Sequence, residues 1–249
     1  MKPNRIEFCV SGRYALFSDP INRMGGEKFS YQVPTYQALK GIAESIYWKP
    51  TFNWVIDEVR IMNPIRSESK GIRPLVYGGS VANTLSIYTY LTEVRYHVRA
   101  HFEWNENRPE LIADRNENKH HNIAKRCVER GGRRDIFLGT RECQGYVEEC
   151  EFDEGIGNYD EVTEIPIGCV FHGFTYPDEN AEKKMIARFA YTTMKKGVIQ
   201  FLRPEECMIT RELFIGNTKE FMMDNKTLSN VSDFNYEEDF GGDEIGVVE

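Results

Sequence analysis

The sequence predicts an α+β protein with a ferredoxin-like N-terminal domain followed by a β-rich C-terminal part. Three observations lead to this prediction. Residues 94–104 alternate strictly between apolar and polar side chains, which is typical of a half-buried strand. Two segments, near residues 35–48 and 118–130, repeat apolar residues at helical spacing. After Gly155 the pattern changes to strand-like segments joined by turns.

The first elements are a strand, a helix and a second strand. Alternating apolar residues predict a strand over residues 5–11. A helix follows, with Thr35 as a plausible N-cap and Pro50 as the residue that stops it. Strand-like sequence comes next at residues 52–62. We expect a long loop over residues 63–83, which contain several glycines and prolines.

The alternating strand at residues 94–104 begins the second half of this domain. One of its faces is apolar, and the other carries Arg, His and Glu, so we expect a cationic outer face. A helix over residues 118–130 ends at Gly131-Gly132. A further strand at residues 144–152 completes the order β-α-β-β-α-β, which also builds RRM-like folds.

These patterns divide the chain into three predicted parts. Residues 1–153 form the RRM-like domain, and residues 154–216 form a β-rich C-terminal domain with strands near 169–174, 186–193 and 198–202. Residues 217–249 are polar and then acidic, so we expect a disordered or partner-dependent tail.

Composition narrows the class of protein. The 249 residues are 41% hydrophobic, which is typical of a globular chain. No apolar run is long enough to span a membrane, and the N-terminus does not resemble a signal peptide, so we expect a cytoplasmic protein. The six cysteines have neither a CxxC pair nor zinc spacing, and we expect reduced, mostly buried thiols and no metal or cofactor.

Charge is segregated along the chain. The formal net charge is −8, but residues 232–249 carry acids and no Lys or Arg. Residues 59–141 hold more Lys and Arg than Asp and Glu. A basic segment in an acidic chain can supply the electrostatic footprint for nucleic acid.

Lys119 and His120 are the strongest candidates for chemistry, because they lie in the first turn of the predicted second helix. Backbone N–H groups and the helix dipole favour an anion there, lysine adds a charge, and histidine titrates near neutral pH. RNA carries its own nucleophile, the 2′-OH, so proton transfer and phosphate stabilisation can cut it without metal. The competing interpretation is a solvated polar helix start.

Tyr47 lies at the end of the first predicted helix. In a ferredoxin-like fold both helices pack on one sheet face, so this end can approach the start of the second helix. Tyrosine there can position a proton or stack on a base. The competing interpretation is a buried tyrosine of the core.

Several further groups are candidates for binding. Arg133, Arg134 and Arg141 follow the second helix, and their guanidinium groups match phosphate geometry, although salt bridges with nearby acids would equally explain them. Gly25-Gly26 and Gly78-Gly79 could let a nucleic-acid backbone approach closely. We expect His97 and His101 on a surface face, not in a metal site. No Walker, dinucleotide or RNP1 motif is present.

At these residues the chain resembles the fifth family of CRISPR-associated (Cas) proteins, in its type I-C (Dvulg) subtype. The likeness covers roughly the first 210 residues. It is carried by YALF at 14–17, GGEKFSY at 25–31, VPTYQALKGI at 33–42, YWKP at 47–50, Asp114-Arg115, Lys119-His120, GGRRDIFL at 131–138 and REC at 141–143.

The resemblance implies an endoribonuclease that cuts CRISPR precursor RNA within the repeat without metal, leaving a 2′,3′-cyclic phosphate and a 5′-OH. Its partners would be the repeat hairpin, the guide-RNA 5′ handle and other Cas subunits of a type I-C surveillance complex. The catalytic residues of the family fall on Tyr47, Lys119 and His120. We predict RNA contacts by Lys28, Lys70, Arg73, Arg115, Arg133, Arg134 and Arg141.

Two other functions compete with this one. A non-catalytic subunit would only cap the guide RNA, as other subtypes of the family do. A metal-dependent DNA nuclease would need clustered carboxylates at a basic site, and the sequence offers no convincing cluster.

Overall fold

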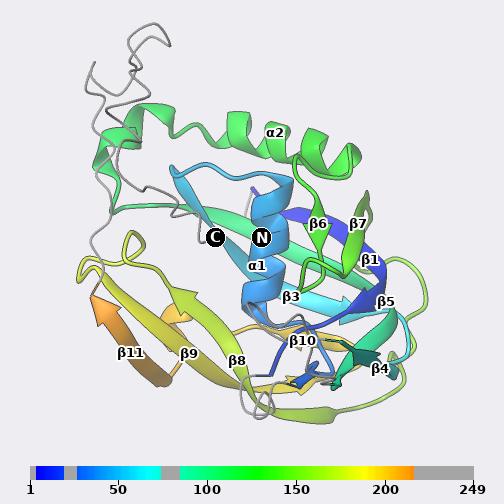
Figure 1. Cartoon of the computed structure of the whole chain (residues 1–249). Coiled ribbons are helices and arrows are strands. Elements are labelled where there is room, and N and C mark those ends of the chain that lie inside the picture. Colours follow the sequence, from blue (N-terminus) through cyan, green and yellow to red (C-terminus); the bar gives the residue numbers. More distant parts are fainter. Residues whose placement is uncertain (1–3, 20–26, 74–84, 216–249) are drawn as a thin grey trace, which may run out of the picture. The chain divides into compact units, whose positions relative to one another are not determined.

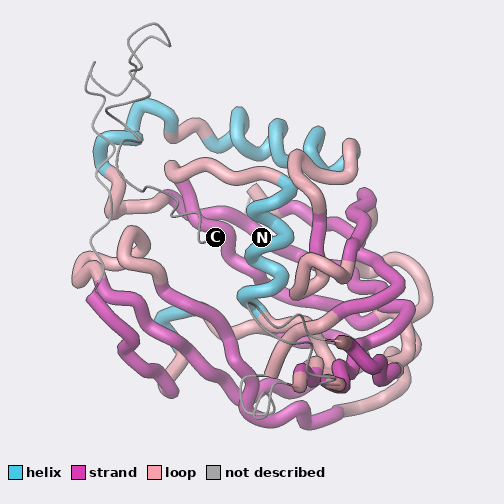
Figure 2. The backbone as a smooth tube through the Cα atoms, in the orientation of Figure 1, coloured by secondary structure: helices cyan, strands magenta, loops and turns pink. Residues whose placement is uncertain are grey.

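The fold is built around one large, mostly antiparallel sheet. The computed structural model describes residues 4–19, 27–73 and 85–215. The strand order in this sheet is β10-β3-β5-β1-β7-β6 (Figure 1). Figure 2 shows the strands of the chain in magenta and its helices in cyan. Two short strands, β2 and β4, pair with the first residues of β5, between residues 86 and 91. The strands are β1 (Ile6–Ala15), β2 (Lys28–Phe29), β3 (Phe52–Ile61), β4 (Ser67–Ile72), β5 (Ser86–Trp104), β6 (Ile136–Phe137), β7 (Gln144–Glu149) and β10 (Val198–Gln200).

The predicted alternation of β5 is confirmed on its apolar face. Val94, Val98 and Phe102 are buried, together with Tyr96 and Ala100. They join an apolar cluster that β1, β3 and both long helices complete. This cluster is the core, and it fixes the register of the central strands because a one-residue slip would turn every apolar side chain outward.

The opposite face of β5 differs from the prediction. His97 and His101 were expected on the surface, but only 5% and 1% of each residue is exposed. The Nδ1–H of His97 donates to the carbonyl of Phe152 at 3.2 Å, and His101 lies 2.9 Å from Asp57. Polar partners from neighbouring segments satisfy these side chains, so a polar face can be covered without leaving unpaired groups.

Two helices cover the core. Helix α1 (Tyr36–Ile46) begins where predicted, and the Thr35 hydroxyl accepts from the Ala38 N–H at 3.2 Å. Helix α2 (Glu117–Glu129) starts one residue earlier than predicted, with Asn116 as its N-cap. It ends at Gly131 and Gly132, whose φ angles of 79° and 103° suit glycine. A 3₁₀ helix, η1 (Pro109–Asp114), connects β5 to α2 (Figure 1).

The predicted loop at residues 63–83 is partly wrong, because β4 (Ser67–Ile72) lies within it. β4 pairs with β5 from Ser86 to Leu91, so β5 also starts earlier than expected. β4 is largely solvent-exposed and polar, and such a strand has no apolar alternation for a sequence to reveal. The first strand is longer than predicted as well, since β1 runs to Ala15.

The C-terminal part forms a second sheet of three antiparallel strands in the order β11-β9-β8. Helix α1 packs against β8, and buried Lys40 on α1 pairs with Glu179 in the loop that follows β8. The predicted strand near residues 198–202 is present as β10, but it pairs with β3 in the large sheet. The strands are β8 (Ile165–Thr175), β9 (Lys184–Met194) and β11 (Ile209–Ile215), with η2 (Pro204–Glu206) before the last.

The chain is therefore α+β, with mostly antiparallel sheets and few helices. Four of the cysteines are buried, as predicted. Among the described residues no helix is both long and apolar enough to cross a membrane. Gly25-Gly26, Gly78-Gly79 and the acidic tail at 217–249 lie outside the described residues.

Candidate active site

The end of α1 and the start of α2 bring Tyr47 and His120 together. Tyr47 is the C-cap residue of α1, and its N–H donates to the Ala43 carbonyl. His120 is the fourth residue of α2. The Tyr47 hydroxyl lies 2.8 Å from Nδ1 of His120. Only 1% of Tyr47 and 0% of His120 is exposed, so the contact is sealed from water.

The hydrogen bonds of His120 define its tautomer. Its Nε2 lies 2.8 Å from the backbone carbonyl of Asp114, and a carbonyl can only accept, so Nε2 carries the proton. Nδ1 of the neutral ring then accepts from the Tyr47 hydroxyl. Burial raises the pKa of Tyr47 to about 12, the charge of Asp114 adds to the effect, and Arg133 opposes it. Tyr47 therefore keeps its proton at neutral pH.

Aromatic rings enclose His120 on its other sides. Phe52, Phe102 and Trp104 have ring centroids 5.4, 6.3 and 5.9 Å from that of His120. A hydrogen bond of 2.7 Å from Trp54 Nε1 to the Tyr47 carbonyl fixes the end of α1 against β3. This packing and the two hydrogen bonds of the ring hold the buried imidazole between polar and aromatic partners.

Lys119 is the exposed member of the site. Its side chain is 50% exposed, and Nζ lies 2.6 Å from Oδ1 of Asp114. The second carboxylate oxygen of Asp114 accepts from the Thr51 hydroxyl at 2.8 Å and lies 3.4 Å from His120 Nε2. The hydrogen bond from Lys119 is the main reason that the pKa of Asp114 is lowered. Asp114 therefore contacts both predicted catalytic residues of α2.

His121 belongs to a different surface. Its Nε2–H donates to the Arg5 carbonyl at 3.1 Å, near the N-terminus of the described chain. Neighbouring residues of a helix point in directions about 100° apart. His121 is therefore not part of the Tyr47–His120 contact.

Arg133 and Arg134 lie next to Tyr47. Their backbone N–H groups donate to the Ser45 carbonyl at the end of α1, and the guanidinium of Arg133 lies 5.9 Å from the centroid of the Tyr47 ring. Both side chains are exposed and form no ion pair with any described residue. Cations beside the predicted catalytic tyrosine suit a phosphate backbone.

Two clefts flank these arginines. One has a volume of about 520 Å³ and lies along the second half of α2; the other, of about 350 Å³, lies at the end of α1. Arg126, Arg130 and Lys49 line them and were missed from the sequence. Arg126 and Arg130 are four residues apart, which places both on one face of the helix. This spacing could have identified them from the sequence as a basic surface beside Arg133. The full linings are Ile123, Arg126, Cys127, Arg130, Gly132 and Arg133 for the first, and Glu44, Ser45, Trp48, Lys49, Pro50, Arg133 and Arg134 for the second.

The other predicted RNA contacts lie apart from this group. Arg115 is engaged within the protein, since it pairs with Glu106 and donates to the Asn105 carbonyl. Lys28 and Lys70 lie over the rings of Tyr88 and Tyr14, at 4.8 and 3.4 Å from the centroids, where β2 and β4 meet β5. Arg73 follows β4, and Arg141 lies between β6 and β7; both are exposed.

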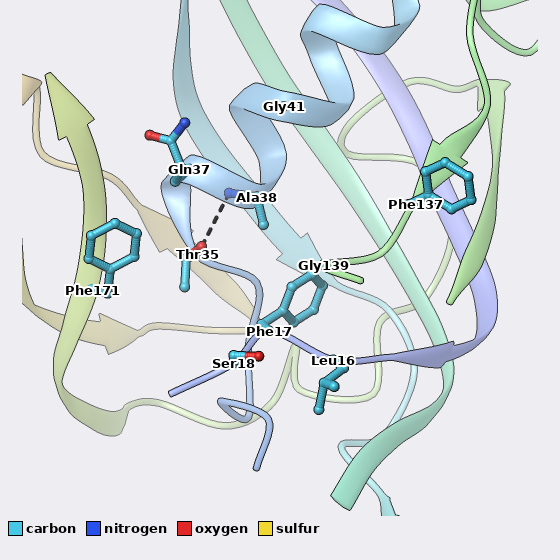
Figure 3. Close-up of a pocket in the computed structure, with 10 residues that line it drawn as sticks. All are labelled: Leu16, Phe17, Ser18, Thr35, Gln37, Ala38, Gly41, Phe137, Gly139 and Phe171. Carbon is cyan, nitrogen blue, oxygen red and sulfur yellow. Dashed lines mark hydrogen bonds between the residues drawn. The ribbon is translucent and has the colours of Figure 1, made fainter. Parts of the chain in front are cut away.

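A further cavity of about 340 Å³ lies at the opposite end of α1 (Figure 3). Its lining contains hydroxyl, amide and apolar groups but no acid, base or cation, so it offers little to phosphate chemistry. The lining residues are Leu16, Phe17, Ser18, Thr35, Gln37, Ala38, Gly41, Phe137, Gly139 and Phe171. Among the described residues no group of three or more His, Cys, Asp or Glu is arranged to hold a metal ion.

Comparison with known proteins places this site in context. The sequence model of a family described as "CRISPR-associated protein (Cas_Cas5)" matches residues 5–202. A protein named CRISPR pre-crRNA endoribonuclease Cas5d from Mannheimia succiniciproducens is 47% identical over 66 residues, which are 26% of this chain and 28% of that protein. One of the same name from Thermus thermophilus is 38% identical over 58 residues, 23% of this chain and 24% of that protein. The alignments thus span about a quarter of the length of these relatives.

Two solved structures are similar over most of their length. A CRISPR-associated protein has a TM-score of 0.71 and 38% identity, and the match covers 83% of this chain and 96% of that one. A functionally uncharacterised protein from Streptococcus mutans has a TM-score of 0.68 and 41% identity, with the same coverage of 83% and 96%.

Proposed function

The chain belongs to the Cas5 family of CRISPR-associated proteins, and from that premise we propose that it is an endoribonuclease that cuts CRISPR precursor RNA within the repeat. It then holds the 5′ handle of the guide RNA in a type I-C surveillance complex with other Cas subunits. The observation that carries this proposal is the cluster of Tyr47, His120 and Lys119 beside a basic cleft. The names of the two curated relatives support the reaction class.

The proposed mechanism uses the 2′-OH of the RNA as nucleophile and needs no metal. A base removes the proton of the 2′-OH, the oxygen attacks the adjacent phosphate, and the 5′ oxygen leaves with a proton from an acid. The products are a 2′,3′-cyclic phosphate and a 5′-OH. Lys119 stabilises the charge of the phosphorane, because its ammonium is the exposed cation of the cluster.

His120 is the proton-exchanging group in this proposal. With Nε2–H on the Asp114 carbonyl, its Nδ1 lone pair accepts from the hydroxyl of Tyr47. Tyr47 keeps its own proton at neutral pH, which supports a role in orienting the 2′-OH and the imidazole over a role as base. Arg133 and Arg134 bind the RNA backbone beside them.

One observation favours the second candidate function, a non-catalytic subunit that caps the guide RNA. His120 and Tyr47 are closed off from solvent, so only Lys119 of the three can touch RNA in this conformation. In an enzyme, RNA binding must expose the side chains of His120 and Tyr47. In a capping subunit they stay closed off from solvent.

For the architecture we propose the RRM-like domain over residues 1–153, the β-rich domain over 154–216 and the acidic tail over 217–249. The order β3-β5-β1-β7 in the sheet, with a helix after β1 and another after β5, supports the ferredoxin-like arrangement of the first domain. We also propose that the protein acts in the cytoplasm, where repeat transcripts are made.

The test is cleavage of the cognate repeat RNA in the presence of a chelator, with mapping of the cut and its termini. We expect Lys119→Ala and His120→Ala to abolish cutting and to spare much of the binding. Lys125→Ala is the matched control, since it removes another exposed lysine of α2 and should cut normally. Tight binding without any cleavage would support the capping subunit, and cleavage only after metal is restored would refute the acid–base mechanism.

A further inference from the structure

Asp114 touches the proposed catalytic residues through two different groups. Its carboxylate lies 2.6 Å from Lys119 Nζ, and its backbone carbonyl lies 2.8 Å from His120 Nε2. We propose that Asp114 is a positioning residue that holds the Lys119 ammonium and the His120 imidazole in their working orientations. This inference rests on the proposed function, because positioning has meaning only if these groups act on RNA.

Asp114 is itself held firmly. The hydroxyl of Thr51, a residue that is 2% exposed, donates to Oδ2 at 2.8 Å. The backbone N–H of Asn116 donates to the Asp114 carbonyl at 2.8 Å. Side chain and backbone are thus fixed by different elements, since Thr51 precedes β3 and Asn116 caps α2. A residue anchored in this way can orient others without RNA present.

The carbonyl contact determines which nitrogen of His120 is available. With its proton held on Nε2, the ring turns the Nδ1 lone pair towards the Tyr47 hydroxyl. In the opposite tautomer the lone pair of Nε2 would face the carbonyl oxygen of Asp114, and the two would repel. The proton on Nδ1 would then have to be accepted by the Tyr47 hydroxyl. Asp114 therefore sets the direction of proton transfer between His120 and Tyr47.

The carboxylate contact determines where Lys119 points. A lysine at a solvated helix start samples many rotamers, and ordering its side chain costs conformational entropy. The ion pair with Asp114 meets that cost before RNA binds, and it places the ammonium on the carboxylate whose other oxygen lies 3.4 Å from His120 Nε2. Asp114→Asn retains an oxygen for Thr51 and the backbone carbonyl for His120, so it removes only the charge that holds Lys119.

The experiment compares Asp114→Asn and Thr51→Val with Asp160→Asn in single-turnover cleavage of repeat RNA in chelator. Asp160 is a matched control because its carboxylate also pairs with a basic side chain and its side chain is also 29% exposed. We expect Asp114→Asn to lower kcat by about tenfold to a hundredfold with little change in KM, as misplacement of a reacting group does. Thr51→Val lowers kcat less, and Asp160→Asn leaves both constants unchanged.

A second measurement reads the geometry without RNA. Nitrogen-15 NMR of the imidazoles should show His120 of the free protein in the Nε2–H form with a slowly exchanging proton. In Asp114→Ala the carbonyl remains but its side-chain anchor on Thr51 is lost, so we expect the Nε2 proton to exchange faster. Asp160→Asn keeps the slow exchange.

The outcomes separate the inference from the proposed function. Three results would overturn the positioning role: an unchanged or raised kcat in Asp114→Asn, a rise in KM with no change in kcat, or an Nδ1–H tautomer in the native protein. If the native protein binds repeat RNA but does not cut it, the proposed function fails, and the tautomer of His120 still decides whether Asp114 holds the imidazole. Thr51→Val provides the same comparison if Asp114→Asn does not fold.

Discussion

The buried hydrogen bond between Tyr47 and His120 makes a prediction that can be measured as a free energy of coupling. Tyr47→Phe removes the hydroxyl and leaves Nδ1 of His120 without a partner in a site that water does not reach. An unpaired buried polar group costs about 1–3 kcal/mol. We therefore expect Tyr47→Phe to lower the free energy of unfolding by that amount, although it removes a single oxygen atom.

His120→Phe leaves the Tyr47 hydroxyl unpaired in the same way, but the double variant leaves neither polar atom behind. Replacement of both partners by apolar groups of similar shape can be nearly neutral. The surrounding rings of Phe52, Phe102 and Trp104 form an environment that accepts a further aromatic ring. The double variant should thus be more stable than the sum of the single variants predicts, by about 1–2 kcal/mol.

Urea unfolding of the four proteins gives this coupling energy directly. The control cycle pairs His120→Phe with Tyr31→Phe, because the Tyr31 hydroxyl also accepts a hydrogen bond, from the partly buried Phe171 N–H at 3.2 Å, and belongs to a different part of the fold. Its coupling should be close to zero. If the Tyr47 cycle is additive within about 0.5 kcal/mol, the hydrogen bond that organises the proposed site does not exist in solution.

Three other predictions test the electrostatics. Burial lowers the pKa of His172 to about 4, and Arg188 acts in the same direction. The folded protein holds this histidine neutral, so it should lose stability as the pH falls from about 6.5 to 4. The loss in the free energy of unfolding should approach about 3 kcal/mol and be absent in His172→Phe. Arg60→Leu removes an ion pair with Asp160 and hydrogen bonds to three carbonyls, and should cost about 2 kcal/mol in urea unfolding. Arg133→Ala with Arg134→Ala should weaken binding of a non-cleavable 2′-deoxy repeat RNA and reduce the slope of log K against log salt by about 2.

Each of these has a control in the same chain. Acid sensitivity that persists in His172→Phe would assign the loss to other groups. Arg60→Leu should leave cleavage by the folded protein unchanged, because the Arg60 side chain hydrogen-bonds to the segment from Phe152 to Asp160. A loss of cleavage without a loss of stability would contradict this expectation. Arg211→Ala removes an exposed arginine of β11 and should leave the salt slope unchanged.

Local rules of sequence predicted the helices well. The Thr35 hydroxyl caps α1, and Gly131-Gly132 ends α2, because each of these events depends on a few adjacent residues. The apolar face of β5 could be predicted for the same reason, since alternation is a property of the strand itself.

Features that depend on distant partners could not be predicted. The polar face of β5 was predicted to be exposed because the partners of His97 and His101, Phe152 and Asp57, lie far away in the sequence. No local pattern indicates such contacts. β4 was missed because its pairing with β5 rests on backbone hydrogen bonds and not on an apolar face. The ion pair of Arg115 with Glu106 likewise depends on the fold and could not be predicted from residue type.

The candidate site shows the same division within two adjacent residues. Lys119 and His120 both suit a phosphate, and sequence gave no reason to treat them differently. On the helix the Lys119 side chain points to solvent, whereas the His120 side chain is buried among aromatic rings. RNA can therefore contact Lys119 before it contacts His120. Asp114 joins the two environments, with its carboxylate on the exposed lysine and its carbonyl on the buried histidine. RNA that reaches Lys119 therefore meets a cation whose position Asp114 sets together with that of the buried imidazole.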